Sequence, residues 1–249
     1  MPVVRRTRTI GKAQRGLLRA LFLFLLIVLA VYFFFQSSFF NVTRVDVRNN
    51  AFLTSVEIKQ LANVPLGANI FKIDENRIKQ NLLLHPLVKD VKISREFPDT
   101  IILTMVERKP LLLIPSEQGF LELDETGIYL KKVSTISDVA LPIVTGVKIP
   151  PNVGPGQVIV DPKLAQALEF LSKVPEEKRK ILMEIEIKDH QQFLVYTPEG
   201  IEVRFGSGSE VEQKLKLLEQ IMQDGKLAGK AVEYIDLSTV ATPVVKYSK

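Results

Sequence analysis

The stretch VKDVKISREFPDTIILTMVE, residues 88–107, decides the fold of the region around it. Two runs that are rich in strand-forming residues, 88–97 and 100–107, are separated only by a tight turn at Pro98 and Asp99. Such a pattern is typical of two neighbouring strands joined by a hairpin turn. We therefore predict a strand pair here and interpret the neighbouring sequence around it.

One strand and two short helices are predicted before this pair. Valines alternate with charged residues over residues 42–48, the period-2 pattern of a half-buried strand. Thr54 and Glu57 have the spacing of a capping box that opens a first helix, and Asp74 is placed to cap a second. The order strand, helix, helix, strand, strand indicates a small three-stranded sheet with two helices on one face. The side chains expected to face its core include Val56, Ile58, Leu61, Ile78, Leu82 and Leu83.

A continuous apolar run, ALFLFLLIVLAVYFFF, occupies residues 20–35. A helix over residues 17–40 would be long enough to cross a hydrocarbon core of about 30 Å. A cleaved signal peptide would end the run with a small-residue cleavage site, which we do not find, and a core helix would be apolar on one face only. We therefore predict an uncleaved, single-pass transmembrane helix at residues 20–40.

The positive charge of the chain is confined to its N-terminus. The 249 residues include 33 basic and 28 acidic side chains, a formal net charge of +5. Six bases and no acid lie in residues 1–19, which leaves 27 bases and 28 acids in the remainder, a net charge of −1. By the positive-inside bias, this predicts a cytoplasmic tail and an outer region that follows the helix. The membrane is thus a predicted partner, and nucleic acid is not. The six bases of this topology signal are Arg5, Arg6, Arg8, Lys12, Arg15 and Arg19.

The remainder of the chain is predicted to form a second domain, mostly of antiparallel strands with flanking helices. Asp161 followed by Pro162 indicates the start of one helix, and Ser209 with Glu212 has the capping-box pattern of another. The two domains together make the predicted fold class α+β. Strands are expected at residues 111–114, 120–123, 181–187, 193–196, 201–205, 232–237 and 244–247.

The sequence offers little material for catalysis. It has no cysteine, which excludes disulfides, thiol nucleophiles and cysteine-ligated metal sites. Its two histidines, His85 and His190, lie at a helix end and in a turn, with no linked serine or carboxylate. The Gly-Ser-Gly-Ser stretch at residues 206–209 lacks the remaining residues of a dinucleotide or Walker loop. We interpret it as the exit of a strand.

Pairs of acidic residues are the remaining candidates, because glycoside hydrolysis needs two carboxylates close together. Glu122 with Asp124, and Glu184 with Glu186, are each spaced two residues apart. This spacing puts each pair on one face of a strand, which we expect to be solvated. We therefore predict no catalytic residue, no cofactor and no metal, and expect no small-molecule substrate.

The predicted strand pair and its flanks carry family-specific motifs. The most specific is the Phe-Pro-x-Thr turn at residues 97–100, followed by a strand that ends in Glu-Arg-x-Pro at 107–110. With further matching stretches, these motifs resemble the bacterial cell-division family FtsQ, called DivIB in many Gram-positive bacteria. Ser238 departs from the pattern, because many relatives carry a basic residue there. The further stretches are residues 45–49, 85–91, 121–127, 141–146 and 234–237.

This resemblance implies a POTRA domain at residues 41–110 and a C-terminal β domain at residues 111–249. It also implies a non-enzymatic scaffold at the division septum that binds FtsL and FtsB/DivIC-type partners and helps to recruit and regulate septal peptidoglycan synthesis. The alternatives are a POTRA-bearing translocation component, which needs many more long strands, and an anchored cell-wall hydrolase, which needs a convergent catalytic set.

The C-terminal strand is the candidate binding site. It ends the chain, so one of its sides could lack a partner strand and accept a strand from another protein. An ordinary terminal strand is the alternative. Glu107, Arg108 and Pro110 are assigned to the domain junction, where the two charged side chains would form either an interdomain ion pair or a solvated surface pair. The partner-binding positions implied by the resemblance are Ser238, Thr239, Thr242, Val244, Val245, Lys246 and Tyr247.

Overall fold

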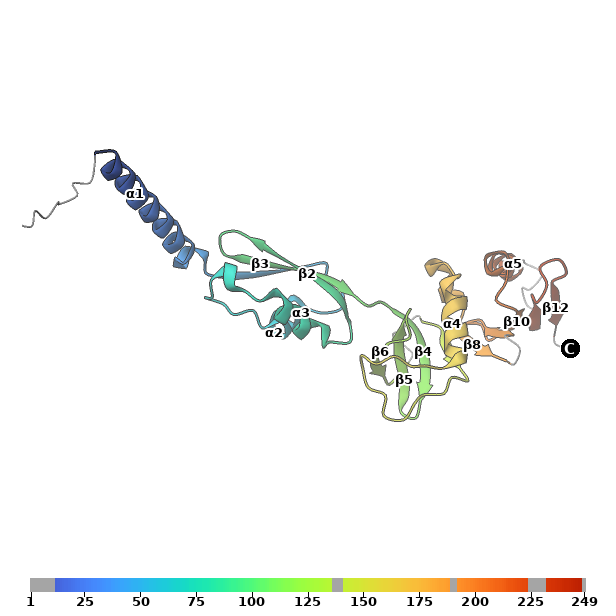
Figure 1. Ribbon diagram of the computed structural model, residues 1–249. Coiled ribbons are helices and arrows are strands. Elements are labelled where there is room, and N and C mark those ends of the chain that lie inside the picture. Colours follow the sequence, from blue (N-terminus) through green and yellow to red (C-terminus); the bar gives the residue numbers. More distant parts are fainter. Residues whose placement is uncertain (1–11, 136–140, 189–191, 224–231, 248–249) are drawn as a thin grey trace, which may run out of the picture. The chain divides into compact units, whose positions relative to one another are not determined.

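A computed structural model describes residues 12–135, 141–188, 192–223 and 232–247 of the chain (Figure 1). These residues form two compact units. The first takes the described residues up to Asn50, then Thr54–Leu82 and Val91–Met105. The second takes Ala51–Leu53, Leu83–Asp90 and the described residues from Val106 onward.

The first unit begins with the apolar helix α1 (Lys12–Phe35), which is followed by the 3-10 turn η1 (Ser38–Phe40). Within Arg15–Phe35 of α1, an 18-residue stretch has a mean hydropathy of 2.7, and none of that stretch is buried. It is therefore long and apolar enough to be a candidate membrane span. The sequence predicted a helix that continues to Phe40. The helix ends earlier because Ser37 adopts an extended conformation, with φ −66° and ψ 156°.

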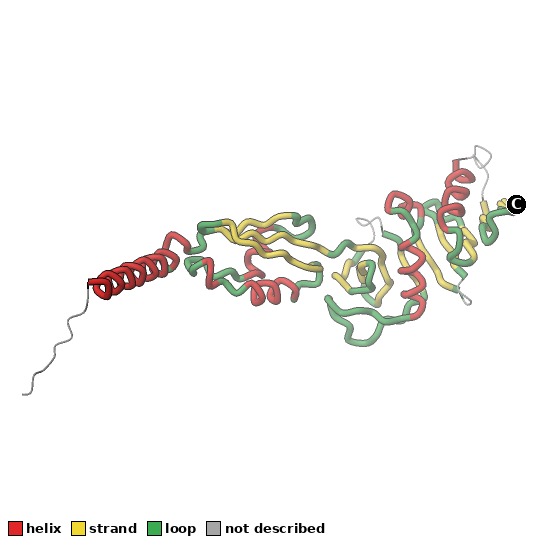
Figure 2. Tube along the Cα trace, turned by 45° about the horizontal axis from the view of Figure 1, so that its top comes forward, coloured by secondary structure: helices red, strands yellow, loops and turns green. Residues whose placement is uncertain are grey.

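A three-stranded sheet follows, in the order β1-β3-β2, and the helices α2 and α3 lie on one side of it (Figure 2). Strand β1 runs parallel to β3, and Arg44 pairs with Thr100 at their starts. The predicted strand–helix–helix–strand–strand order is thus confirmed. The elements are β1 (Arg44–Arg48), α2 (Ser55–Ala62), η2 (Ile70–Lys72), α3 (Glu75–Leu83), β2 (Val88–Glu96) and β3 (Thr100–Glu107).

The capping box that opens α2 is confirmed, because the Glu57 backbone N–H donates to Thr54 Oγ1 and the Thr54 N–H donates to the Glu57 carboxylate. The predicted core residues are partly wrong. Val56 is 64% exposed, whereas Ile58 is fully buried. The buried face of α2 passes through Ile58 and Ala62, four residues apart, and this spacing turns Val56 toward solvent. Leu83, at the end of α3, is likewise exposed.

The second unit contains a nine-stranded sheet in the order β12-β11-β10-β9-β8-β7-β4-β5-β6. Its pairings are mostly antiparallel, as predicted; the parallel ones are β10 with β11, β7 with β8 and β4 with β7. The strands are β4 (Pro110–Ser116), β5 (Gly119–Asp124), β6 (Tyr129–Val133), β7 (Ile143–Thr145), β8 (Glu184–Ile187), β9 (Phe193–Tyr196), β10 (Glu202–Gly206), β11 (Val232–Asp236) and β12 (Val244–Tyr247).

The helices α4 (Pro162–Ser172) and α5 (Val211–Gln223) pack on one face of this sheet, and η3 (Glu176–Ile181) leads from α4 into β8. Phe170 of α4 joins the helices to the strands: its ring stacks on Phe193 at 4.6 Å and meets Phe205 edge-on at 5.1 Å between ring centroids. The Asp161 side chain accepts hydrogen bonds from the backbone of Lys163 and Leu164, so the predicted cap of α4 is confirmed.

Ser209 does not cap α5, which corrects the second capping-box prediction. The helix begins at Val211, after Glu210 in a left-handed conformation (φ 51°), and the Ser209 hydroxyl bonds to Ser207 instead. Lys214 also contacts this segment, because its buried ammonium donates to the carbonyls of Phe205 (2.8 Å) and Ser207 (3.1 Å). Burial lowers the pKa of Lys214. The Gly-Ser-rich stretch is thus held by a lysine of its own chain.

The spacing of Glu122 and Asp124 predicted a solvated face, and this prediction is wrong. Each of the two residues is only 2% exposed. Strand β5 lies between β4 and β6, and Leu113, the register partner of Glu122, is fully buried, so this face of the sheet is covered. The Lys131 ammonium lies 3.5 Å from Glu122 Oε2. The predicted one-sided exposure fails because both faces of this strand are covered.

Candidate partner-binding edge

Strand β12 stands at one end of the order of strands in the large sheet. It pairs with β11 antiparallel, with Val244 opposite Asp236, Val245 opposite Ile235 and Lys246 opposite Tyr234. Within the described residues, no strand pairs with its other side. Main-chain donors and acceptors on such a side can pair with a strand from another chain.

The turn before β12 is fixed on the neighbouring strands. The Leu237 N–H donates to the carbonyl of Arg204 (2.8 Å), and Asp236 Oδ1 accepts from both the N–H (2.9 Å) and the hydroxyl (2.6 Å) of Ser238. Gly206, with φ +70°, lies beneath Ser238, where an added Cβ would come within 2.8 Å of the Ser238 Cα. Ser238 therefore acts by fastening the turn that leads to β12.

A row of polar side chains crosses the three terminal strands. Glu202, Tyr234 and Lys246 are register partners on β10, β11 and β12. The Arg204 guanidinium lies 3.7 Å from the centre of the Tyr234 ring, and the Lys246 ammonium lies 5.4 Å from it. Contacts of this kind hold cations over an aromatic face.

Ion pairs hold the two cations beside the Tyr234 ring, Lys246 and Arg204, in place. The Lys246 ammonium donates to Glu233 at 2.9 Å, and this hydrogen bond raises the pKa of Lys246. The hydrogen bond between Arg204 and Glu202, at 3.0 Å, similarly raises the pKa of Arg204. The apolar side chain of Val244 beside them is 51% exposed. The edge thus combines an exposed apolar position with a fixed pattern of charge.

The opposite edge of the sheet, β6, is partly covered. The N–H of Tyr129 donates to the Gln157 carbonyl (2.9 Å), and the Gly156 N–H donates to the Tyr129 carbonyl (2.7 Å). Lys131 and Lys132 are exposed on the same strand, and lysines protect edges against pairing. Of the two edges of this sheet, β12 is therefore the better candidate for strand addition.

Comparison with known proteins assigns the family. The family model described as "POTRA domain, FtsQ-type" matches residues 40–108, and the one described as "Cell division protein FtsQ/DivIB, C-terminal" matches residues 113–238. This chain belongs to the FtsQ/DivIB family. It is a cell division protein with a role in the divisome. The family assignment favours this interpretation over the translocation component and the cell-wall hydrolase that were considered for the sequence.

Relatives of this family align over most of the chain. The DivIB protein of Clostridium tetani is 26% identical over 231 residues, which are 90% of this chain and 86% of the relative. The FtsQ protein of Streptomyces venezuelae is 28% identical over 233 residues, 92% of this chain and 83% of the relative. A solved structure, the major extracytoplasmic domain of the trans isomer of DivIB from Geobacillus stearothermophilus, is 20% identical with a TM-score of 0.34, covering 47% of this chain and 92% of that one.

Glu107 and Arg108, assigned to the domain junction of this FtsQ/DivIB chain, bond to different partners. The Glu107 carboxylate accepts three backbone N–H groups, from Ala51 (2.9 Å), Phe52 (2.7 Å) and Leu53 (3.2 Å). All these residues belong to the second unit. Glu107 therefore holds a short backbone segment, a role that no local sequence signal indicated.

Arg108 forms an ion pair with Asp124 at 2.8 Å, and both residues belong to the second unit. Asp124 also accepts hydrogen bonds from Thr126 and from the backbone of Ile128. Pro110 begins β4 and pairs with Asp124 across the sheet. Arg108 thus binds the buried carboxylate of Asp124, and Pro110 lies opposite the same residue in the sheet. The sequence had predicted Asp124 only as a solvated partner of Glu122.

The remaining predicted residues are less informative. Of the topology signal in this FtsQ/DivIB chain, Arg15 and Arg19 are exposed on α1, Lys12 is its first residue, and Arg5, Arg6 and Arg8 lie outside the described residues. The His85 side chain accepts a hydrogen bond from the Leu87 N–H within its own turn (3.3 Å), and His190 lies outside the described residues.

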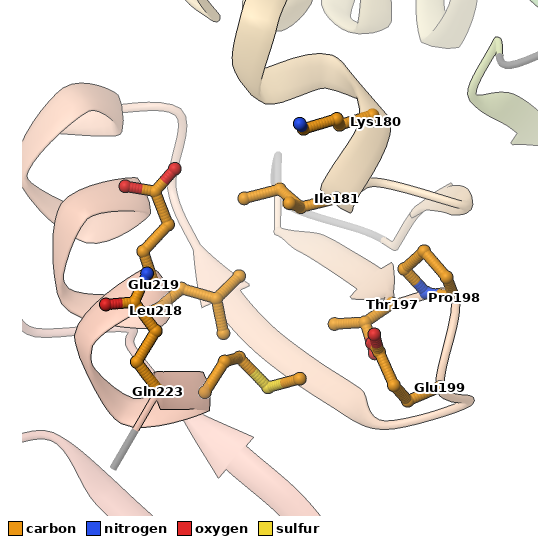
Figure 3. A pocket seen from close by; sticks show the side chains of 9 residues that line it. Lys180, Ile181, Thr197, Pro198, Glu199, Leu218, Glu219 and Gln223 are labelled. Carbon is orange, nitrogen blue, oxygen red and sulfur yellow. The ribbon is translucent and has the colours of Figure 1, made fainter.

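One pocket of about 500 Å³ opens beside α5 (Figure 3). Lys180 and Ile181 enter it from η3, Thr197 to Glu199 from the β9–β10 turn, and Leu218, Glu219, Met222 and Gln223 from α5. The Glu219 carboxylate is paired with Lys178 at 2.9 Å, and Thr197 Oγ1 accepts from the Ile201 N–H. The polar side chains of Glu219 and Thr197 are therefore engaged in structural contacts. In the described part of the chain, no group of three or more His, Cys, Asp or Glu residues could hold a metal ion.

Proposed function

We propose that this protein is a non-enzymatic, membrane-anchored scaffold of the divisome that binds FtsL and FtsB/DivIC-type partners. Its residues 1–19 lie in the cytoplasm, residues 20–40 include the anchor, and the domains at residues 41–110 and 111–249 lie outside the cytoplasm at the septum. The bound partners help to recruit and regulate septal peptidoglycan synthesis. The observation that carries the proposal is the place of β12 at the end of the large sheet, where no strand covers it within the described residues.

The partner adds a strand to β12 in this proposal. Main-chain hydrogen bonds supply affinity in this mode, and alternate side chains supply specificity. Val244 offers an apolar contact, and the paired charges of Lys246 and Glu233 favour one register over others. Ser238, Thr239 and Thr242 form the turn that holds β12 in place, with the Thr242 N–H donating to the Thr239 carbonyl.

Removing residues 244–249 is expected to abolish co-purification of the FtsL and FtsB/DivIC-type proteins of the host. The rest of the fold should survive, because among the described strands β12 pairs only with β11, and the buried Ile235 and Leu237 remain. Far-ultraviolet circular dichroism of the purified full-length and truncated chains checks the fold. The matched control removes only residues 248–249. Unchanged co-purification by the longer truncation contradicts docking at β12.

The proposed topology is tested by a reporter fused to the C-terminus. Alkaline phosphatase, which is active only outside the cytoplasm, is expected to be active in this position, because the six basic residues before the apolar run retain the N-terminus inside. Green fluorescent protein exported by the same route is expected to be dark. A fluorescent fusion without phosphatase activity would place the C-terminus in the cytoplasm and refute the topology.

A further inference from the structure

A continuous row of phenylalanine rings leads from the end of α1 into the sheet domain of the first unit. Phe35, in the last turn of α1, meets Phe71 at 5.3 Å between centroids, and Phe40 meets Phe71 at 5.2 Å. Phe71 in turn stacks on Phe97 at 5.2 Å. Phe71 and Phe97 are 40% and 57% exposed, so the row ends in aromatic surface that the domain itself leaves uncovered.

The topology explains why Phe97 lies at the anchor end of the domain. Strand β1 begins at Arg44, shortly after η1, so its start is the end of the sheet nearest α1. Because β1 and β3 are parallel and Arg44 pairs with Thr100, β3 begins at this same end. Phe97 belongs to the turn just before β3, and the Thr43 N–H donates to the carbonyl of Asp99 in that turn (2.9 Å).

Hydrogen bonds fasten the Phe71 loop to the end of α1. Asn69 Nδ2 donates to the Phe35 carbonyl at 2.7 Å, and Lys72 Nζ donates to Gln36 Oε1 at 2.8 Å. Asn69 also forms a β-bridge with Asn41, just beyond η1. Phe71 is therefore held beside the residues at which the candidate span ends.

Exposed aromatic rings next to a membrane span suit the boundary between headgroups and acyl chains. Rings of this kind are enriched where a protein crosses from lipid to water, and apolar side chains bind there by burying about 5–10 Å into the boundary. Two cations lie at the same end of the domain: Lys72, and Arg44, whose side chain is 72% exposed although it lies 3.7 Å from Asp99, which is 22% exposed. Cations in this position are attracted to anionic lipid headgroups.

We propose that Phe71 and Phe97 form a second membrane contact, which seats the sheet domain on the outer lipid surface beside the anchor. The ligand is the lipid itself, because the ring row is continuous with the candidate span and the flanking cations match anionic headgroups. This inference rests on the proposed membrane anchor and adds a restraint that a single helix cannot supply. The hydrogen bonds of Asn69 and Lys72 hold the domain at the end of α1, and the two aromatic rings add a direct contact between the domain and the bilayer.

Tryptophan fluorescence tests this contact, because the chain contains no tryptophan and each substitution adds one reporter. The full-length variants F97W and F71W are reconstituted into vesicles of phosphatidylcholine and phosphatidylglycerol, with and without lipids brominated on their acyl chains. Both tryptophans are expected to emit at a shorter wavelength than a tryptophan that is exposed to buffer. Both are also expected to lose much of their emission when the lipids are brominated. Circular dichroism verifies that each variant is folded.

Two further variants make the result decisive. Val56 is 64% exposed in the first turn of α2, which starts after β1 has carried the chain away from the anchor, so V56W should be quenched by aqueous iodide and not by bromolipid. F24W lies within the span and should be quenched by bromolipid. If F24W is quenched but F97W and F71W behave like V56W, the second contact is refuted and the anchor stands. If F24W is also unquenched, the anchor itself is refuted.

Discussion

Replacing Val244 by lysine is expected to weaken partner binding by about tenfold or more, equivalent to about 1.4 kcal/mol of binding free energy. Val244 is half exposed on the edge strand, where an added strand would cover it. Lysine on an edge opposes strand addition, because the incoming strand must pass over a hydrated charge. Affinity is measured with the full-length chain in detergent, as the dissociation constant for the purified FtsB/DivIC-type partner.

The fold should tolerate this substitution. Val244 pairs with Asp236 across the ladder, so the new ammonium faces a carboxylate, and opposite charges in this position are favourable. V158K is the matched control: Val158 is 52% exposed against 51% for Val244, and it lies away from β12. Both variants add one positive charge. Equal loss of affinity in the two would indicate a general charge effect, and unchanged affinity in V244K would contradict strand addition.

The elements that the sequence predicted well are those with strong local signals. The pair β2 and β3 is determined by a short turn between two β-branched runs, and the starts of α2 and α4 by capping residues that bond to backbone nearby. In each case the decisive interaction spans only a few residues. The local conformational preferences of these residues and their hydrogen bonds then favour the same conformation as the tertiary packing does.

Strands β6 and β7 were missed because their stability comes from distant partners. Strand β7 has three residues and lies between β4 and β8, with parallel pairing on both sides. A segment so short has no readable period, and parallel neighbours come from far along the chain. The burial of Glu122 and Asp124 was missed for a related reason, since the alternation of a strand does not reveal whether its second face is covered.

The candidate edge was predicted in position but not in detail. An edge strand was predicted at residues 244–247, and β12 stands at one end of the strand order. The row of Glu202, Tyr234 and Lys246 comes from three strands, two of them paired in parallel, so their alignment depends on register. Register is fixed by packing over the whole sheet, which no single stretch of sequence contains.

Replacing Asp124 by alanine is expected to destabilise the second unit by about 3 kcal/mol, within the range for breaking one side of a buried ion pair. The Asp124 side chain is 3% exposed and that of Arg108 is 18% exposed, so the arginine regains little hydration when its partner is lost. The hydrogen bonds from Thr126 and Ile128 are lost as well. The free energy of unfolding is measured by urea denaturation of the full chain in detergent micelles.

The neighbouring acid provides the control. Glu125 pairs with Lys89 at 2.9 Å, but its side chain is 68% exposed, and exposed pairs contribute about 0–1 kcal/mol. E125A should therefore leave the unfolding free energy within about 1 kcal/mol of the parent chain. Equal changes in the unfolding free energy of D124A and E125A would show that the burial of Asp124 does not add to its contribution to stability.

The pH dependence separates the charge of Asp124 from its packing. Burial by itself would raise the pKa of Asp124, but the hydrogen bonds from Thr126, Ile128 and Arg108 outweigh it, so the pKa is lowered from its ordinary value of 3.8. A carboxyl with a lowered pKa contributes stability that is complete above the ordinary value and is lost as the pH falls through the folded value. The difference in unfolding free energy between the parent chain and D124A should therefore be constant near neutral pH and shrink below about pH 3.8. A difference that stays constant into this acid range would mean that the ionised carboxylate is not what stabilises the segment.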